Sequence, residues 1–366
     1  MNRVVITGMG CLAGSIKHCT VFDTTGLSTD KFAEIDGLDR ENRLYDIIRR
    51  TVGDMLADTG LTKEDISGYG ADCRMFFGTL LARDNAYLEH SRSGADSLAV
   101  MNEFAVYAAG LAGVRGTVDI SSASCAAGTT AIGMAFDFIR NGFCTAAVAG
   151  GAEELTQIAG FGFNCLKSLS KDVCNPYDVK RDGINIGEGG AFFMLETLGS
   201  ALARKAKIYC EILGFASGND AYHATSPEPT GEEAYHLMMN ALGDAGITAG
   251  QTDYINGHGT GTMLNDSMET GALKKLYDGV EKKPFVSSTK AVIGHCMGAS
   301  GAVELASVLN SMQSGEPVVM PNLTEPLDDS GMFDAPEKIS IDYAMSNSFG
   351  FAGNSASIVI RKWVEK

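Results

Sequence analysis

Residues 120–131 read ISSASCAAGTTA and place one cysteine between a β-branched run and a long apolar segment. Thr117–Ser121 predicts a strand, and Cys125–Arg140 predicts a helix that is apolar almost all round, as in the core of a large protein. At such a junction the helix N-terminus lowers a thiol pKa, and backbone N–H groups can hold an oxyanion. The alternative interpretation is a buried structural cysteine, the usual state of a free cysteine.

The same pattern returns in the second half of the chain. Val286-Ser287-Ser288 leads through a glycine-rich turn, Gly294–Gly301, into another apolar helix at Ala299–Gln313. A strand, a serine pair, a small-residue turn and a buried helix therefore occur twice. The repeat favours an internal duplication, but it is also a theme that any α/β protein can reuse.

Strands and helices alternate along the rest of the chain, which predicts an α/β fold with parallel or mixed sheets. Further strands are expected at Val4–Thr7, Met75–Gly78, Ala146–Gly150, Ile208–Phe215, Tyr254–Asn256, Phe285–Ser287, Ser346–Phe349 and Ser357–Ile360. Further helices are expected at Asn42–Thr59, Ser97–Gly110, Glu232–Ala245 and Met268–Leu276.

Composition excludes several classes of protein. A chain of 366 residues with 45% apolar residues can bury a large core, and its length favours two halves. The net charge of −16, with no run of basic residues longer than two, argues against nucleic acid as a partner. No apolar stretch approaches the ~20 residues of a membrane span.

The cysteines indicate a reducing compartment. Nine cysteines without a CxxC pair argue against a disulfide scaffold and a zinc ribbon. The N-terminus enters the short apolar strand Val4-Val5-Ile6 at once, without a charged region followed by the long apolar run of a signal peptide. We therefore expect a cytoplasmic protein with no metal site.

A histidine flanked by glycines occurs at residues 256–262, NGHGTGT. The glycines remove side-chain cover, so His258 is expected to face a cavity, and Thr260 and Thr262 can point their hydroxyls the same way. A lone loop histidine is more often incidental, but this context argues for a site.

A lysine and a histidine follow in residues 288–295, STKAVIGH. Lys290 and His295 lie in an uncharged, small-residue region, where burial is costly unless they are paired or functional. Glu304 is the natural counter-charge, and a purely structural ion pair of Lys290 with Glu304 is the alternative.

The last candidate segment is NSFGFAGN at residues 347–354, where a strand runs into a loop with glycines. Apolar residues between glycines suit a movable flap, and a plain β-turn is the alternative. Together, the cysteine, the two histidines and the lysine indicate thioester chemistry.

These segments resemble the elongating β-ketoacyl-acyl-carrier-protein synthases, which have the thiolase-like duplicated fold, five-layered α-β-α-β-α. The resemblance runs along nearly the whole chain and adds VVITGMG at 4–10 and RDGINIGEGGA at 181–191. It implies halves at 1–205, with the cysteine, and 206–366, with the histidines and lysine. It further implies condensation of an acyl thioester with malonyl carrier protein, in fatty acid or type II polyketide or polyene biosynthesis.

The resemblance also implies residue roles. Cys125 would carry the acyl chain, and the N–H groups of Cys125 and Phe351 would form the oxyanion hole. His258 and His295 would act on the malonyl group as neutral donors, with Lys290 and Glu304 holding His258.

The family assigns the remaining roles to substrate contacts. Thr260 and Thr262 would bind the phosphopantetheine arm, which arrives on the carrier protein, so no cofactor is required. Phe351 would gate the acyl pocket. Arg40 and Arg43 would form the landing patch for the acidic acyl carrier protein.

Some features depart from the family pattern. Cys11–Asp30 replaces a tryptophan-containing helical segment, Leu80 and Leu81 add bulk near the acyl pocket, and Ala352 stands where a glycine is usual. These changes predict a pocket restricted for long saturated chains and a specialised pathway.

Two points stay open at the level of sequence. We expect either a homodimer or a heterodimer with a chain-length-factor-like subunit. The alternatives for function are a non-catalytic chain-length-factor-like partner and a malonyl decarboxylase or acyltransferase. The retained Cys125, His258, Lys290 and His295 argue against the non-catalytic partner.

Overall fold

Ten strands form one continuous hydrogen-bonded series in the computed structural model, which describes residues 1–82 and 97–364. One set comprises β1 (Val4–Ala13), β4 (Cys73–Gly78), β5 (Val118–Ser121), β6 (Ala146–Glu153) and β7 (Gly189–Thr197). The other comprises β8 (Cys210–Asn219), β9 (Tyr254–Asn256), β10 (Phe285–Ser287), β11 (Tyr343–Phe349) and β12 (Asn354–Lys362). The two sets join where Val4–Ile6 of β1 pairs with β8.

The two sets of strands have the same topology. The order is β5-β4-β6-β7-β1 in one set and β10-β9-β11-β12-β8 in the other. In each set the first three strands are parallel, the fourth runs antiparallel to them, and the fifth again runs in the direction of the first three. The structure therefore shows the duplication as a repeated fold. The division of the chain into halves at residue 205 stays a prediction.

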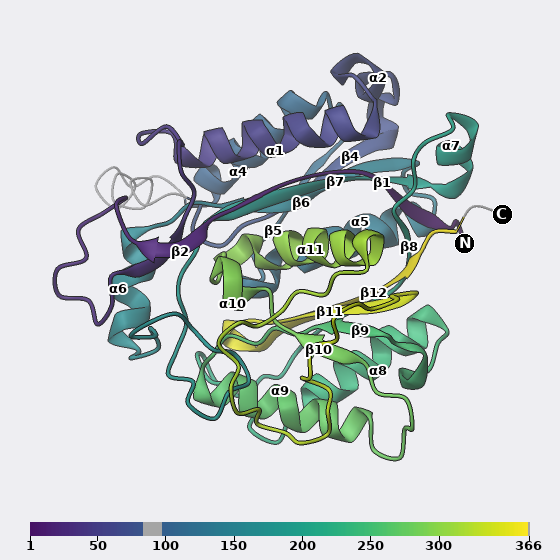
Figure 1. Cartoon of the computed structure of the whole chain (residues 1–366). Coiled ribbons are helices and arrows are strands. Elements are labelled where there is room, and N and C mark those ends of the chain that lie inside the picture. Colours follow the sequence, from purple (N-terminus) through teal and green to yellow (C-terminus); the bar gives the residue numbers. More distant parts are fainter. Residues whose placement is uncertain (83–96, 365–366) are drawn as a thin grey trace.

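Helices cover and separate the two sets of strands, giving five layers (Figure 1). The outer layers contain α1 (Arg43–Thr59) and α4 (Ser97–Ala112) on one side, and α8 (Glu232–Ala245) and α9 (Met263–Leu276) on the other. The middle layer contains α5 (Ala127–Arg140), α10 (Lys290–Ile293) and α11 (Ser300–Ser314). This is the predicted thiolase-like α/β fold, and the prediction is confirmed.

Helices α5 and α11 approach closely in the middle layer because each has a glycine at the contact. A Cβ on Gly128 would lie 2.9 Å from the Ala302 nitrogen, and one on Gly301 would lie 1.9 Å from Thr129 Oγ1. Each helix is preceded by a 3-10 turn, Ser124–Ala126 before α5 and Met297–Ala299 before α11. Both turns contain a non-glycine residue with positive φ, Ser124 at 50° and Met297 at 48°. The two repeats thus match in backbone detail.

Some elements differ from the sequence prediction. β7 was not predicted because a glycine pair opens it and the strand is buried on both faces, so it has no polar alternation. Helix α9 begins five residues earlier than expected, since Thr262 caps it by accepting a hydrogen bond from the Asn265 N–H.

The smaller elements were not predicted either. They are α2 (Lys63–Gly68), α6 (Gln157–Cys165), α7 (Leu198–Ala203), β2 (Ser15–His18) and β3 (Lys31–Glu34). Strand β2 and the loop that follows it lie in the segment that departs from the family pattern, and β3 comes directly after it. Phe22 in the loop packs edge-on against Phe32 of β3 at 5.2 Å.

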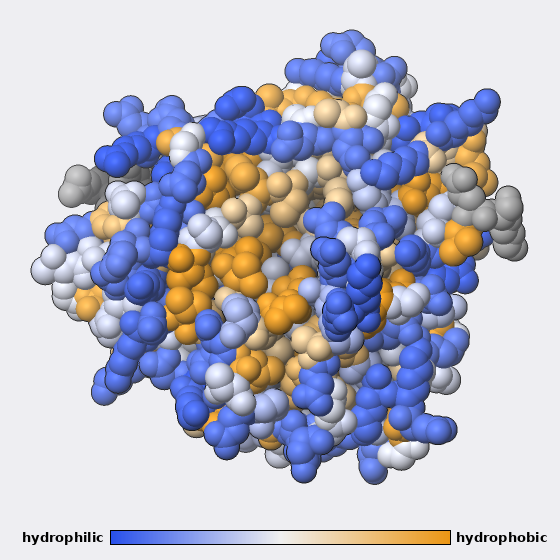
Figure 2. All heavy atoms as spheres, in the orientation of Figure 1, coloured by the Kyte–Doolittle hydropathy of each residue, from blue (hydrophilic) through white to orange (hydrophobic). Residues whose placement is uncertain are grey.

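The face shown in Figure 2 has hydrophobic side chains in its middle and hydrophilic ones around the rim. In the same orientation, Figure 1 places α10 and α11 of the middle layer here. Val292 of α10, for example, is exposed. Among the described residues, no helix is both long enough and apolar enough to cross a membrane.

Candidate active site

Cys125 lies in the 3-10 turn that opens α5, and its side chain is buried. Burial raises the pKa of its thiol to about 11, although Lys290 and a hydrogen bond from the Phe351 N–H act in the opposite direction. The expectation of a lowered thiol pKa is therefore wrong for the free protein. Desolvation of the thiolate outweighs the helix terminus and the nearby cation.

Two histidines face the cysteine. One ligand-type atom from each of Cys125, His258 and His295 lies within 4.8 Å of the others. The two imidazole rings are perpendicular, at 88°, with centroids 5.4 Å apart. The fold thus brings together Cys125, in the turn after β5, and two histidines that are 133 and 170 positions away, in the segments after β9 and β10.

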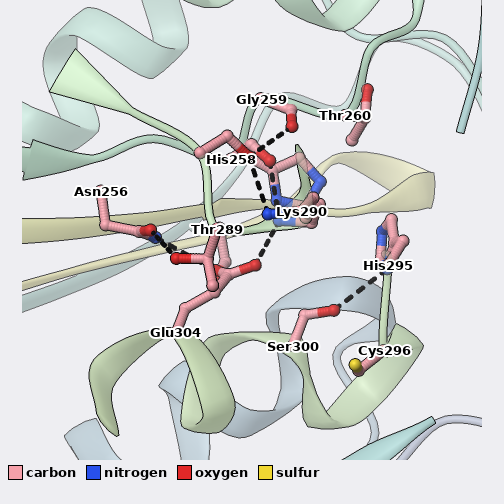
Figure 3. A network of polar contacts seen from close by, with 12 residues as sticks. Asn256, His258, Gly259, Thr260, Thr289, Lys290, His295, Cys296, Ser300 and Glu304 are labelled. Carbon is pink, nitrogen blue, oxygen red and sulfur yellow. Dashed lines mark hydrogen bonds and ion pairs between the residues drawn. The ribbon is translucent and has the colours of Figure 1, made fainter. Parts of the chain in front are cut away.

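Lys290 fixes the proton on His258. Its Nζ lies 3.2 Å from His258 Nδ1 and donates to the His258 carbonyl at 2.7 Å (Figure 3). An ammonium group can only donate, so Nδ1 accepts and the ring proton resides on Nε2. Lys290 also pairs with Glu304, whose other oxygen accepts from Asn256 at 3.3 Å. Burial and the Lys290 charge lower the pKa of His258 well below its usual range.

His295 has the same proton arrangement from different partners. The Met297 N–H donates to its Nδ1 at 3.0 Å. Ser300 Oγ lies 3.0 Å from the same atom (Figure 3). Its Nε2 therefore carries the proton. Burial and Lys290 lower the pKa of His295 well below its usual range. Both histidines are thus neutral and have an N–H at Nε2.

This proton arrangement is unsuited to a metal. A histidine that binds a metal usually donates its other ring N–H to a carboxylate or a carbonyl. Here the Nδ1 atoms of His258 and His295 face donors instead, so both Nε2 lone pairs are occupied by protons. The absence of a metal from the reaction remains a proposal.

Two buried carboxylates hold the loop that bears His258, and sequence reasoning missed both. Glu269 accepts the N–H groups of His258 at 2.8 Å and Gly259 at 2.9 Å, while Asp266 accepts that of Thr260 at 3.0 Å. Burial raises the pKa of Glu269 to about 7. A detectable signal was present, because both lie in the first two turns of the helix that Thr262 caps.

Cys125, His258 and His295 lie at the inner end of a cavity of about 360 Å³. Thr260, Thr262 and Phe351 also line it. Thr260 Oγ1 and Thr262 Oγ1 are 2.9 Å apart, so the two hydroxyls do lie together. The outer part is formed by Ser217–Asp220, Thr225–Glu228, parts of α6, α8 and α9, and neighbouring loops.

Phe351 stacks on Phe163 of α6, with ring centroids 5.4 Å apart and planes at 25°. The next residue, Ala352, has φ 57° and ψ 24°, a left-handed conformation that favours glycine. Two hydrogen bonds hold it there, from Ala352 N–H to the Ala224 carbonyl at 2.8 Å and from Asn219 Nδ2 to the Ala352 carbonyl at 2.7 Å.

Leu80 and Leu81 lie outside the lining of this cavity. They pack against a separate hydrophobic cluster that includes Phe163 and Met297, and Phe351 packs against the same cluster. The two leucines thus share a hydrophobic cluster with Phe351 but do not line the cavity that contains Cys125. Their contact with an acyl chain stays a prediction.

The two arginines of the expected landing patch have different environments. Arg40 is exposed, in agreement with a surface role. Arg43 is buried, and its guanidinium forms an ion pair with buried Glu188 and donates to the Ile35 carbonyl at 3.2 Å. The prediction that Arg43 belongs to a surface patch is wrong, because it is committed to an internal salt bridge.

Comparison with known proteins finds two family models that match this chain. Residues 32–201 match the model described as "Beta-ketoacyl synthase, N-terminal domain", and residues 209–324 match "Beta-ketoacyl synthase, C-terminal domain". The chain belongs to the β-ketoacyl synthase family. The predicted family is therefore confirmed.

Named relatives include a putative mitochondrial 3-oxoacyl-[acyl-carrier-protein] synthase of Schizosaccharomyces pombe, 39% identical over 268 residues, and 3-oxoacyl-[acyl-carrier-protein] synthase 2 of Rhizobium meliloti, 40% identical over 253 residues. The matches cover 67% and 66% of this chain. They span only 61% and 59% of those relatives' own lengths.

Solved structures match over the whole fold. A β-ketoacyl synthase from Burkholderia phymatum has a TM-score of 0.88 at 29% identity, covering 100% of both chains. The ishigamide ketosynthase/chain length factor has a TM-score of 0.88 at 26% identity, covering 99% of this chain and 100% of that one. A type II PKS acyl-carrier protein in complex with its ketosynthase has a TM-score of 0.88 at 25% identity, covering 99% of this chain and 100% of that one.

Proposed function

We propose that this protein is a 3-oxoacyl-[acyl-carrier-protein] synthase that performs a decarboxylative Claisen condensation. The observation that carries the proposal is the meeting of Cys125 with two neutral imidazoles, each with an Nε2 proton, at the end of one cavity. Family membership and the named relatives support it.

In the first half-reaction, the Cys125 sulfur attacks the carbonyl of an acyl thioester. The thioester bond to the carrier breaks, and the carrier thiol leaves with the cysteine proton. The N–H groups of Cys125 and Phe351 hold the transient oxyanion. Because burial raises the pKa of the Cys125 thiol to about 11, its proton leaves only as the carrier sulfur departs.

In the second half-reaction, malonyl thioester loses CO₂, and the electrons of the broken C–C bond form an enolate. Two Nε2–H groups, from His258 and His295, stabilise its oxygen. The enolate carbon then attacks the acyl carbonyl, the bond to the Cys125 sulfur breaks, and the sulfur leaves as a thiolate that takes up a proton from water. Lys290 and Glu304 keep the His258 proton on Nε2, so these residues position that ring.

The carrier and partner assignments belong to the same proposal. Thr260 and Thr262 would bind a phosphopantetheine arm that enters through the cavity, and no cofactor of the chain's own is needed. Support for an acyl carrier protein and a second subunit comes from the titles of the similar complexes. We also propose a cytoplasmic location and either a homodimer or a heterodimer with a chain-length-factor-like subunit.

Intact-mass spectrometry of acyl loading tests the first half-reaction. Incubation with acyl carrier proteins of graded chain length should add one acyl group to the wild type. Cys125→Ser should add none, whereas Cys165→Ser, at an exposed position on α6, should load normally. Loading of Cys125→Ser at the wild-type level would refute the role of Cys125.

A further inference from the structure

Glu153, at the end of β6, is a fully buried carboxylate that neither half-reaction uses. Four backbone N–H groups point at it. Leu80 and Gly298 donate to Oε2 at 2.7 and 3.0 Å, and Leu81 and Ala82 donate to Oε1 at 2.8 and 2.6 Å. Thr79 Oγ1 adds a fifth contact at 3.2 Å. One oxygen therefore ties the turn after β4 to the turn that precedes α11.

Gly298 occupies a special position in the repeat. It follows Met297, just as Cys125 follows Ser124, and both preceding residues have the same positive φ. Gly298 is thus the second repeat's counterpart of the nucleophile. A Cβ there would lie 2.4 Å from the Leu80 nitrogen and 2.6 Å from Glu153 Oε2. The Glu153 carboxylate fills the space that a side chain would need.

The same turn sets the orientation of His295. The Met297 N–H, one residue before Gly298, is the donor that keeps the His295 proton on Nε2. The Gly298 carbonyl oxygen also lies close to Gly128 of α5. It is 3.1 Å from the point where a Cβ on Gly128 would lie. A shift of Gly298 would therefore move the donor of His295 relative to Cys125.

We propose that Glu153 is a positioning residue that holds Gly298, and through it the Met297 N–H, so that His295 presents Nε2–H to the malonyl group. This inference rests on the proposed condensing function. Leu80 of the other turn packs against the cluster that contains Met297 and contacts Phe351, so Glu153 also anchors a residue of that cluster. A displacement of about 1 Å at a catalytic group can cost ~10²-fold in rate.

The test compares Glu153→Gln with the wild type in both half-reactions. Glutamine has nearly the same size as glutamate, but its NH₂ group replaces one of the two accepting oxygens. That NH₂ would face backbone N–H groups that need an acceptor. We expect malonyl decarboxylation to fall by about 10–100-fold. Acyl loading of Cys125 should persist with an altered chain-length profile. Glu196→Gln is the matched control, since Glu196 is also fully buried but bonds Thr7, Tyr69, Ser200 and Arg204.

A second variant and a second readout keep the result decisive. If Glu153→Gln does not fold, Thr79→Val removes one donor and should lower decarboxylation by a smaller factor. Ring ¹⁵N chemical shifts should show His295 protonated at Nε2 in the wild type and a mixture of tautomers in Glu153→Gln. That readout needs no turnover, so it separates failure here from failure of the proposed function. Wild-type decarboxylation and unchanged His295 shifts in a folded variant would overturn the proposal.

Discussion

At the scale of the single residue, Cys125 experiences opposing influences. Its buried site disfavours the thiolate, while Lys290 and the Phe351 N–H favour it, and burial dominates. The protein therefore does not store a reactive thiolate. Under the proposed function, the buried thiol stays protonated until it reacts with a thioester whose leaving thiol takes its proton.

Alkylation as a function of pH checks this point. With a thiol pKa of about 11, labelling of Cys125 by iodoacetamide should rise about tenfold per pH unit from pH 7 to pH 10, because only the thiolate reacts. At pH 7 the exposed Cys165 should be labelled before Cys125. This reverses the order that a lowered pKa would give. Peptide mapping in which Cys125 labelling levels off by pH 8 would contradict it.

The histidines allow the two half-reactions to be separated. His258→Ala and His295→Ala should each still acylate at Cys125 but lose malonyl decarboxylation by ~10²–10³-fold, as for loss of one oxyanion donor. His18→Ala, at an exposed position on β2, is the control. Carbon dioxide release at the wild-type rate from either variant would rule out the two-donor mechanism.

At the scale of the element, the crossing of α5 and α11 depends on two missing side chains. Gly301→Ala would place a methyl group within 1.9 Å of Thr129 Oγ1 and 2.8 Å of the Thr129 nitrogen. We expect it to lower the free energy of unfolding by about 1–3 kcal/mol through overpacking. Chemical denaturation measures this loss.

Gly243→Ala on α8 is the control for that substitution. No heavy atom lies within 4 Å of the position of its Cβ, so alanine should stabilise the helix by about 0.5–1 kcal/mol. Equal effects of the two substitutions would show that the crossing does not require Gly301.

The gate turn makes a second prediction at this scale. Ala352 has a left-handed φ, which is strained for alanine and unstrained for glycine. Ala352→Gly should therefore relieve about 1–2 kcal/mol of backbone strain. The Phe351 ring should then separate from Phe163 more often. Acyl loading with longer donors should become several-fold faster. Lys205→Gly, at φ 55° after α7, relieves similar strain away from the gate and should leave loading unchanged. Slower loading by Ala352→Gly would contradict this account of the gate.

The bounds of strands and helices were predicted correctly where a local sequence pattern alone determines the secondary structure. Strands β9 and β10 and helix α8 have the predicted bounds, since each is a short apolar run or an amphipathic stretch between turn residues. Asp266 and Glu269 bind N–H groups of the preceding loop and were missed because the start of α9 was predicted five residues too late. Glu153 was missed because its partners lie on two turns that only tertiary structure brings together. Arg43 was misassigned for the same reason, since its partner Glu188 is 145 residues away.

At the scale of the whole molecule, duplication explains why the site lies between the repeats. One repeat supplies Cys125 at a helix start, and the other supplies His258 and His295 from the loops after β9 and β10. In the first repeat, the corresponding turn after β4 is held by Glu153. Two similar folds thus form one candidate active site and one structural counterpart.

Under the proposed function, acyl transfer to Cys125 and malonyl decarboxylation are joined in one condensation. The direct measurement is mass spectrometry of the carrier-bound product after incubation with acyl and malonyl carrier proteins. The account predicts a 3-oxoacyl chain two carbons longer than the donor, formed with release of one CO₂, and none from Cys125→Ser. Release of CO₂ with only acetyl carrier protein as product, or extension by Cys125→Ser, would contradict it.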